Sequence, residues 1–151
     1  AFQRAHDQRQ SITCIMMDID HFKSFNDHFG HQVGDEVLKV TAQILTGGVR
    51  SHDVLCRYGG EEFCIVMPRT GGEEAARVAE QLRVTIESRA AKNVRGLRDV
   101  NITASFGVCE FSQHKTCEDL IRDADQALYL AKEEGRNRVK LHKPTLQAVT
   151  A

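Results

Sequence analysis

Two adjacent glycines, Gly59 and Gly60, separate two short runs of β-forming residues. A two-residue connection of this kind predicts a β-hairpin, because glycine reaches positive φ without a steric penalty. The carboxylates of Glu61 and Glu62 follow the turn directly. A turn without side chains lets a bulky anion approach the backbone, and acids beside it can hold the divalent cation that accompanies a polyphosphate. We therefore expect the hairpin to fix both the sheet and an anion-binding site.

Hydrophobic periodicity predicts the elements on either side of the hairpin. The continuous apolar run at 12–17 is typical of a strand buried on both faces. Apolar residues at helical spacing predict a helix over 32–46, which the glycines at 47–48 are expected to end. Alternation over 100–111 predicts a long strand, in which Gly107 indicates close backbone packing. In chain order we expect a strand (12–17), a short helix (21–29), a helix (32–46), two hairpin strands (54–58 and 63–67), a helix around 75–86, a strand (100–111), a helix around 120–131 and a strand (138–141).

This order of elements predicts an α+β fold with the split βαβ core of ferredoxin-like sheets. In that arrangement the first and third strands lie side by side and antiparallel in the middle of the sheet. The end of the first strand, at Asp18, then meets the start of the third, at Glu61. Two acids far apart in the sequence are therefore expected to converge beside the glycine turn.

Composition excludes several classes of function. The 151 residues suffice for one domain with a hydrophobic core, and 20 Lys and Arg against 21 Asp and Glu leave no basic field for a nucleic acid polymer. No apolar run reaches membrane-spanning length and no signal peptide is visible, so we expect a cytoplasmic segment without membrane contact. The five cysteines show no C-x-x-C spacing, and those in β-like runs are expected to be small buried hydrophobic residues.

Several ordered motifs resemble one known family. Residues 59–63 read GGEEF, residues 18–23 read DIDHFK, and residues 26–35 read NDHFGHQVGD. Further on, residues 103–108 read TASFGV, and the stretch at 125–137 contains DQALY and AKEEGRN. Together they resemble the GGDEF family, the diguanylate cyclases, over roughly residues 11–141. The D-x-L-T-x-L-x-N-R segment with which family domains usually open is missing from the chain.

The resemblance implies an enzyme that joins two GTP molecules into cyclic di-GMP and releases two pyrophosphates. It implies a palm-like sheet as in polymerases, Mg²⁺ as cofactor with Mn²⁺ as a substitute, and a homodimer in which each protomer holds one GTP. We expect residues 1–10 to end a linker or truncated helix, residues 11–141 to form the catalytic domain, and residues 142–151 to be a polar tail. Because the chain does not begin with Met, we expect it to be a fragment of a longer protein. The signal that controls the domain is expected to act through an upstream sensory domain of that protein.

The same resemblance assigns the metal and catalytic residues. Asp18, Glu61 and the backbone carbonyl of Ile19 would ligate Mg²⁺, which prefers hard oxygen ligands in octahedral geometry. Glu62 would either ligate a second metal ion or assist proton transfer. The alternative interpretation is that these are solvated acids at strand ends.

Other matching positions would bind the substrate. Asn26 and Asp35 resemble the family's guanine readers; Asp35 would accept hydrogen bonds from the N1–H and 2-amino groups, which adenine cannot supply. The alternatives are local turn chemistry for Asn26 and a helix-dipole acid for Asp35.

Lys23, Lys132 and Arg136 would neutralise the triphosphate, and Arg136 can bind phosphate through two parallel hydrogen bonds. Gly59 and Gly60 would give the phosphates access to the backbone, and Phe22 is either core or a backbone contact to the nucleotide. The alternative for the cations is ordinary stabilisation of a helix C-terminus, or a surface lysine in the case of Lys23.

Residues 50–53, RSHD, resemble the family's R-x-x-D inhibitory site for the product. Arg50 and Asp53 would bind cyclic di-GMP, and Arg57 would either complete this site or flank the hairpin. The alternative interpretation is an arginine that follows a helix and an acid that starts a strand.

Two other functions compete with the cyclase. One is a catalytically silent module that binds GTP or cyclic di-GMP and regulates a partner, against which the retained acids argue. The other is an adenylyl-cyclase-like enzyme, which Asp35 disfavours because ATP would leave this charged acceptor without its donors.

Overall fold

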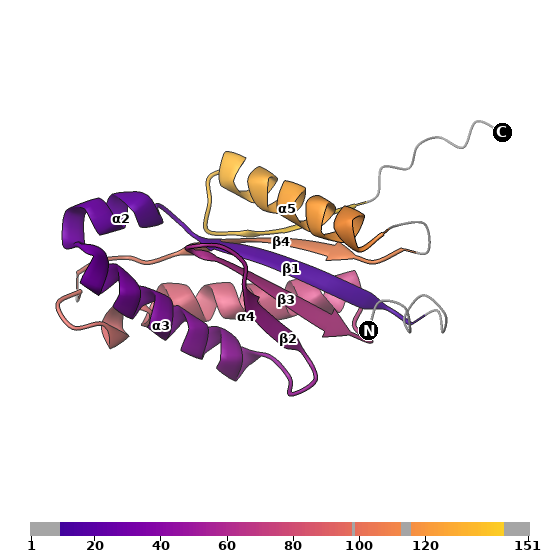
Figure 1. Ribbon diagram of the computed structural model, residues 1–151, viewed down its shortest axis with the longest axis horizontal. Coiled ribbons are helices and arrows are strands. Elements are labelled where there is room, and N and C mark those ends of the chain that lie inside the picture. Colours follow the sequence, from indigo (N-terminus) through magenta and orange to yellow (C-terminus); the bar gives the residue numbers. More distant parts are fainter. Residues whose placement is uncertain (1–9, 98, 113–115, 144–151) are drawn as a thin grey trace.

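The computed structural model describes residues 10–97, 99–112 and 116–143, and its centre is a five-stranded sheet with helices on both faces (Figure 1). Residues 1–9 of the expected linker or truncated helix (1–10) and residues 144–151 of the expected tail (142–151) lie outside the described residues. The elements are β1 (Ile12–Ile19), α2 (Phe22–Phe29), α3 (His31–Gly48), β2 (Val54–Arg57), β3 (Glu62–Pro68), α4 (Gly72–Arg89), the 3₁₀ turn η1 (Ala91–Asn93), β4 (Ala104–Glu110), α5 (Cys117–Glu133) and β5 (Val139–Leu141).

The strand order is β2-β3-β1-β4-β5, which confirms the predicted α+β fold with β1 and β3 adjacent. β1 runs antiparallel to both β3 and β4, and β5 joins β4 in parallel. The register opposes Asp18 to Glu62 on one side and to Ser105 on the other. Glu61 lies one residue further on, where its carbonyl accepts a hydrogen bond of 3.4 Å from the backbone N–H of Ile19.

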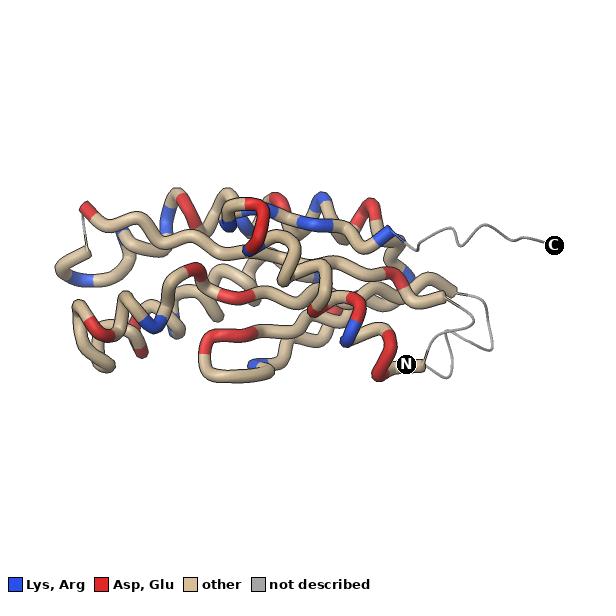
Figure 2. The backbone as a smooth tube through the Cα atoms, turned by 90° about the horizontal axis from the view of Figure 1, so that it is seen from above, with Lys and Arg blue, Asp and Glu red and all other residues tan. Residues whose placement is uncertain are grey.

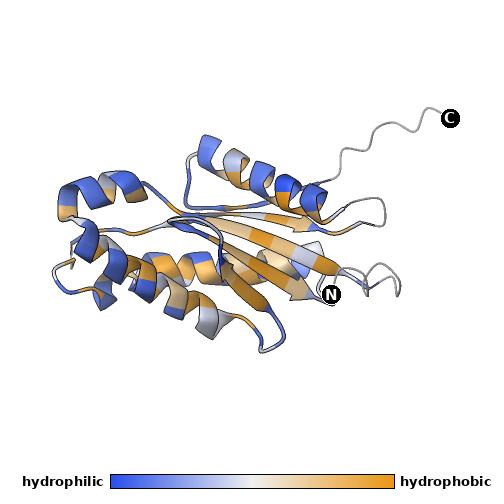
Figure 3. Ribbon diagram, viewed as in Figure 1, coloured by the Kyte–Doolittle hydropathy of each residue, from blue (hydrophilic) through white to orange (hydrophobic). Residues whose placement is uncertain are grey.

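The core has two layers because side chains alternate across β1, all of which is buried as predicted. Ile15 and Met17 pack with α3 and α4, whereas Cys14 and Met16 pack with α5 on the other face. In Figure 3 the strands are mainly hydrophobic, and the helices combine hydrophobic and hydrophilic residues. No described helix is long and apolar enough to cross a membrane.

Glycines let two pairs of elements approach closely. A Cβ added to Gly107 would lie 2.1 Å from the carbonyl oxygen of Ala124, which confirms the predicted close packing in this strand. Gly48 plays a similar part: it is the last residue of α3, which ends at the glycine pair as expected, and a Cβ at Gly48 would lie 2.4 Å from Leu82 Cδ2 on α4. This glycine therefore permits close helix–helix contact at the end of α3.

Two expectations were wrong in detail. The long strand is shorter than predicted, since β4 begins at Ala104. Its neighbour β1 ends at Ile19, and just beyond that end the Thr103 carbonyl still accepts a hydrogen bond of 2.9 Å from the backbone N–H of Asp20. The hairpin connection spans residues 58–61 instead of two glycines, and neither glycine takes a positive φ.

Candidate active site at the carboxylate edge

Asp18, Ile19 and Glu61 meet at the edge where β1 ends and β3 begins. They line one small depression of about 170 Å³ together with the cationic side chains of Lys23, Lys132 and Arg136. Asp20, His21, Phe22 and Ser24 complete its wall. The structure thus brings together residues from the start, middle and end of the domain, as the strand order predicts for the two acids. Elsewhere, acidic and basic residues are interspersed along the backbone (Figure 2).

Asp18 has an ionisable side chain in a buried position, where its charged form is destabilised. Its side chain is only 8% exposed and Oδ2 accepts a hydrogen bond from Lys132 Nζ, whereas the buried Oδ1 has no hydrogen-bond partner among the described residues. Burial raises the pKa of Asp18 to about 6, against the opposing effect of Lys132 and with a further contribution from Glu61. A cation placed at Oδ1 would relieve this cost, which makes the group a candidate for metal binding.

Glu62 lies on the same edge, opposite Asp18 in the β1–β3 register. Burial raises the pKa of Glu62, and the nearby carboxylate of Asp125 raises it further. A Cβ on Gly59 would lie 3.6 Å from Glu62 Oε2, so the glycine turn borders this carboxylate without crowding it. Asp125 belongs to α5 and was not identified from the sequence as a site residue; only the docking of α5 on the sheet brings it close.

Asp20 is a hydrogen-bonding centre that sequence reasoning left without a role. Its Oδ2 accepts from Thr103 Oγ1 at 2.7 Å and from the backbone N–H of Asn137 at 3.0 Å, and its Oδ1 accepts from Ser105 Oγ at 2.6 Å. Asn137 and Arg136 both have positive φ, 48° and 65°. Asp20 therefore holds the left-handed backbone that follows α5 and carries Arg136, a conformation that non-glycine residues adopt only when their surroundings fix it.

The expected guanine readers lie beside the turn between α2 and α3. The Oδ1 atom of Asn26 is buried without a hydrogen-bond partner, and a Cβ on Gly34 would overlap it at 1.7 Å. Asp35 is exposed, is the fifth residue of α3 and so follows its first turn, and lines a separate depression with Lys39 and Arg95. The structure therefore does not place Asp35 in the same depression as Asp18.

Arg50 and Asp53 are in contact in the loop before β2. The backbone N–H of Arg50 donates to Asp53 Oδ2 at 2.8 Å, and the Arg50 guanidinium reaches Thr70 Oγ1 at 2.7 Å and Glu74 at 3.5 Å. Arg57 does not join them: its Nη2 donates to the Gly60 carbonyl at 2.7 Å. In this position Arg57 stabilises the hairpin turn.

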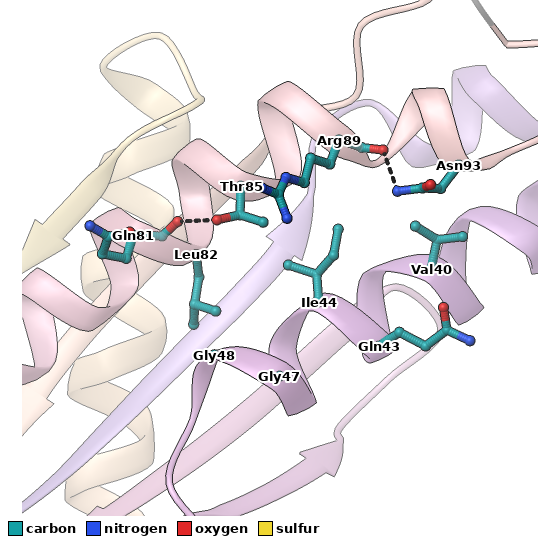
Figure 4. A pocket seen from close by; sticks show the side chains of 10 residues that line it. All are labelled: Val40, Gln43, Ile44, Gly47, Gly48, Gln81, Leu82, Thr85, Arg89 and Asn93. Atoms are coloured by element: carbon teal, nitrogen blue, oxygen red, sulfur yellow. Dashed lines mark hydrogen bonds between the residues drawn. The ribbon is translucent and has the colours of Figure 1, made fainter.

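A larger hollow of about 560 Å³ lies between α3 and α4 (Figure 4). Its wall includes Ile44 and Gly48 on α3 and Leu82 and Arg89 on α4. No residue that the sequence assigned to a site lines it, so it is separate from the carboxylate edge.

Comparison with known proteins identifies the class. A family model described as "Diguanylate cyclase, GGDEF domain" matches residues 1–138, and the chain belongs to this family. It is 42% identical over 135 residues to diguanylate cyclase DosC of Escherichia coli K12, covering 89% of this chain and 29% of DosC. It is 44% identical over 131 residues to diguanylate cyclase VdcA of Vibrio cholerae, covering 86% of this chain and 39% of VdcA. The chain thus spans well under half the length of these relatives.

Solved structures of other proteins match this chain in fold. The GGDEF domain of DgcB from Caulobacter crescentus, in complex with c-di-GMP, matches with a TM-score of 0.88 at 34% identity, over 95% of this chain and 84% of that one. The active GGEEF domain of a diguanylate cyclase from Vibrio cholerae matches with a TM-score of 0.88 at 38% identity, over 95% and 90%. The fold and the family found by these comparisons are therefore consistent with the cluster of acids and cations at the edge where β1 ends and β3 begins, which we call the carboxylate edge.

Proposed function

We propose that residues 11–141 form a diguanylate cyclase domain that condenses two GTP molecules into cyclic di-GMP and two pyrophosphates. The observation that carries this proposal is the single depression in which Asp18 and Glu61 meet Lys132 and Arg136. Acids for a metal ion and cations for a triphosphate are the two halves of a nucleotidyl-transfer site.

The acids fit Mg²⁺, with Mn²⁺ as a substitute. Asp18 Oδ1 is a buried, ionisable oxygen without a hydrogen-bond partner in the described chain, and Glu61 and Ile19 line the same depression. These hard oxygen donors are of the type that Mg²⁺ prefers. When bound, the ion lowers the pKa of the attacking hydroxyl and neutralises charge on the phosphates.

The chain's own side chains supply the remaining functions. Arg136 and Lys132 bind triphosphate oxygens and stabilise the charge on the departing pyrophosphate, with Lys23 as a third cation. The raised pKa of Glu62 favours the second of its two expected roles, in which its carboxylate accepts the proton of the ribose 3′-hydroxyl. The 3′-oxygen then bonds to the α-phosphorus of the other GTP while the bond to pyrophosphate breaks.

Asn26 and Asp35, beside the α2–α3 turn, select guanine over adenine. Asp35 accepts from the N1–H and 2-amino groups, and ATP would leave this acceptor without those donors. The buried Oδ1 of Asn26 is a further acceptor, to which no residue in the described part of the chain donates a hydrogen bond. Because the two residues lie beyond the Asp18 depression, the nucleotide spans from the α2–α3 turn to the carboxylate edge.

The reaction requires a homodimer. Each phosphodiester bond of the product joins the 3′-oxygen of one GMP to the phosphate of the other, so two half-sites, one from each protomer, face each other. Cyclic di-GMP bound at Arg50 and Asp53 holds the dimer in an unproductive arrangement. In the longer protein an upstream sensory domain controls this encounter, in the cytoplasm where GTP is present.

The test is incubation of the protein with GTP and Mg²⁺ across protein concentrations, with chromatographic analysis of nucleotides. We expect cyclic di-GMP at a rate that rises faster than linearly with protein concentration. Glu61→Gln should abolish the product, and Glu118→Gln, an exposed acid at the start of α5, should not. Binding of GTP or cyclic di-GMP without turnover, under conditions that relieve product inhibition, would establish the silent binding module instead.

A further inference from the structure

We infer that Cys109, Asp123 and His142 form a binding site for Zn²⁺ at the end of the sheet that lies away from the carboxylate edge. One ligand atom from each residue lies within 4.8 Å of the other two. None of the three belongs to the proposed cyclase site, so the inference stands independently of that activity.

Three elements bring these ligands together. Cys109 is the penultimate residue of β4, is 1% exposed and faces α5, which carries Asp123. His142 directly follows β5, and its backbone N–H donates to the Val108 carbonyl at 2.7 Å. This bond extends the β4–β5 pairing by one residue, so the backbone that carries the imidazole is fixed beside Cys109.

The spacing of the ligand atoms suits a tetrahedral ion. His142 Nε2 lies 3.8 Å from Asp123 Oδ2. With metal–ligand bonds of about 2.0 to 2.3 Å, the ligand atoms of a tetrahedral zinc site lie roughly 3.3 to 3.7 Å apart. The other carboxylate oxygen, Oδ1, lies 3.8 Å from Arg122 Nε, so the two oxygens face different partners. The ligand atoms, which lie within 4.8 Å of one another, would move closer together to enclose the ion.

The ligand types select the metal. A thiolate and an imidazole favour Zn²⁺ and related transition ions over Mg²⁺, which prefers oxygen ligands only. The Asp123 and His142 side chains are 13% and 18% exposed, so a water molecule can take the fourth position. Binding releases the Cys109 thiol proton to solvent and replaces a weak hydrogen bond, 3.6 Å long, from Sγ to the Glu110 carbonyl.

A metal ion at this site would stabilise the folded domain and would take no part in the cyclase reaction. Cys109 pairs with Cys14 in the register, whereas Ser105 pairs with Asp18. Four residues of strand separate the two positions, which is about 13 Å. An ion bound by Cys109, Asp123 and His142 would join β4, α5 and the segment after β5, and would stabilise the folded domain by mass action.

The experiment uses Co²⁺ as a spectroscopic probe on the whole chain, freed of metal with a chelator and kept reduced. We expect one equivalent of Co²⁺ to produce a thiolate-to-cobalt charge-transfer band, which added Zn²⁺ abolishes. Cys109→Ser should remove the band, and His142→Ala should weaken Co²⁺ binding at least tenfold. Zn²⁺ should raise the Tm of the wild type and leave that of Cys109→Ser unchanged.

Two control variants make the test specific. Cys56→Ser removes an exposed thiol on β2, and His52→Ala removes a histidine that lies 3.8 Å from a carboxylate oxygen of Asp53. Both should bind Co²⁺ as the wild type does. Absence of the band, its persistence in Cys109→Ser, or its loss in either control would overturn the inference. His142→Ala, outside the core, keeps the test valid if Cys109→Ser folds poorly.

Discussion

The buried carboxylate of Asp18 should make the metal-free domain less stable as the pH rises. The pKa of this group is about 6 in the folded chain, against 3.8 for an ordinary aspartate. The folded state therefore holds a proton between pH 4 and 6 that the unfolded state releases, so the stabilising effect is complete below about pH 4 and is lost as the pH passes 6. The shift corresponds to about 3 kcal/mol.

The variant Asp18→Asn isolates this effect because its side chain is uncharged at every pH. The amide has its own constant cost, since a buried N–H group would lack an acceptor, so the comparison rests on pH dependence and not on a single value. Between pH 4 and pH 7.5 the free energy of unfolding of Asp18→Asn should improve relative to the wild type by about 3 kcal/mol. For a domain of this size that is a relative shift in Tm of roughly 6 to 12 °C.

The assay is urea unfolding, followed by circular dichroism, of chelator-treated protein at several pH values. Glu118→Gln gives the baseline for replacing an exposed acid by its amide. Adding Mg²⁺ at pH 7.5 should stabilise the wild type and not Asp18→Asn, since only an ionised carboxylate gains from the ion. A difference between wild type and Asp18→Asn that stays constant with pH, or that changes with the opposite sign, would refute the reasoning.

Three further variants test other parts of the structure. Asp20→Asn should raise the KM for GTP more than it lowers kcat, because Asp20 positions the backbone that carries Arg136; equal effects on both constants would contradict this role. Arg50→Ala should raise the concentration of cyclic di-GMP needed for half-maximal inhibition at least tenfold and keep the initial rate within about twofold; unchanged inhibition would remove Arg50 from that site. Gly107→Ala should lower the free energy of unfolding in urea by about 3 kcal/mol or more, because the methyl group would overlap backbone atoms of α5, whereas Gly47→Ala, with open space around it, should not destabilise the domain.

The proximity of Asp18 and Glu61 could be predicted from the sequence because it follows from the pairing of their two strands alone. The buried run at 12–17 identifies a central strand, and the order of elements places the hairpin strand beside it. Antiparallel pairing then brings the end of one strand to the start of the other. The one-residue difference, with Glu62 and not Glu61 opposite Asp18, depends on the length of the turn.

The turn itself was mispredicted because a side chain shapes it. Gly-Gly suggested a two-residue connection with positive φ, yet the guanidinium of Arg57 donates to the carbonyl of Gly60 and holds a longer loop. A pattern of residue types does not reveal a contact between an arginine and a carbonyl three residues away. The glycines still give the expected access, since a Cβ on Gly60 would meet nothing within 4 Å.

The tertiary structure was needed to recognise the role of Asp20, although the sequence contains one indication of it. Thr103 and Ser105 are hydroxyl residues two apart, so they share a face of the strand that the sequence predicts over 100–111. Two such groups beside a buried strand require acceptors, and the acid that follows β1 is the nearest candidate. Asn137, by contrast, reaches Asp20 only because α5 returns the chain to the sheet.

The carboxylate edge as a whole is assembled at a cost to stability. Burial raises the pKa of both Asp18 and Glu62, and Glu61 and Asp125 add negative charge close by. Lys132 offsets part of this charge at Asp18 but leaves Oδ1 without a partner. A protein selected only for stability would replace such a cluster with apolar residues. The cluster is understandable if cations complete it during the reaction, so the same buried acids that weaken the metal-free domain are those that prepare it to bind Mg²⁺ and a triphosphate.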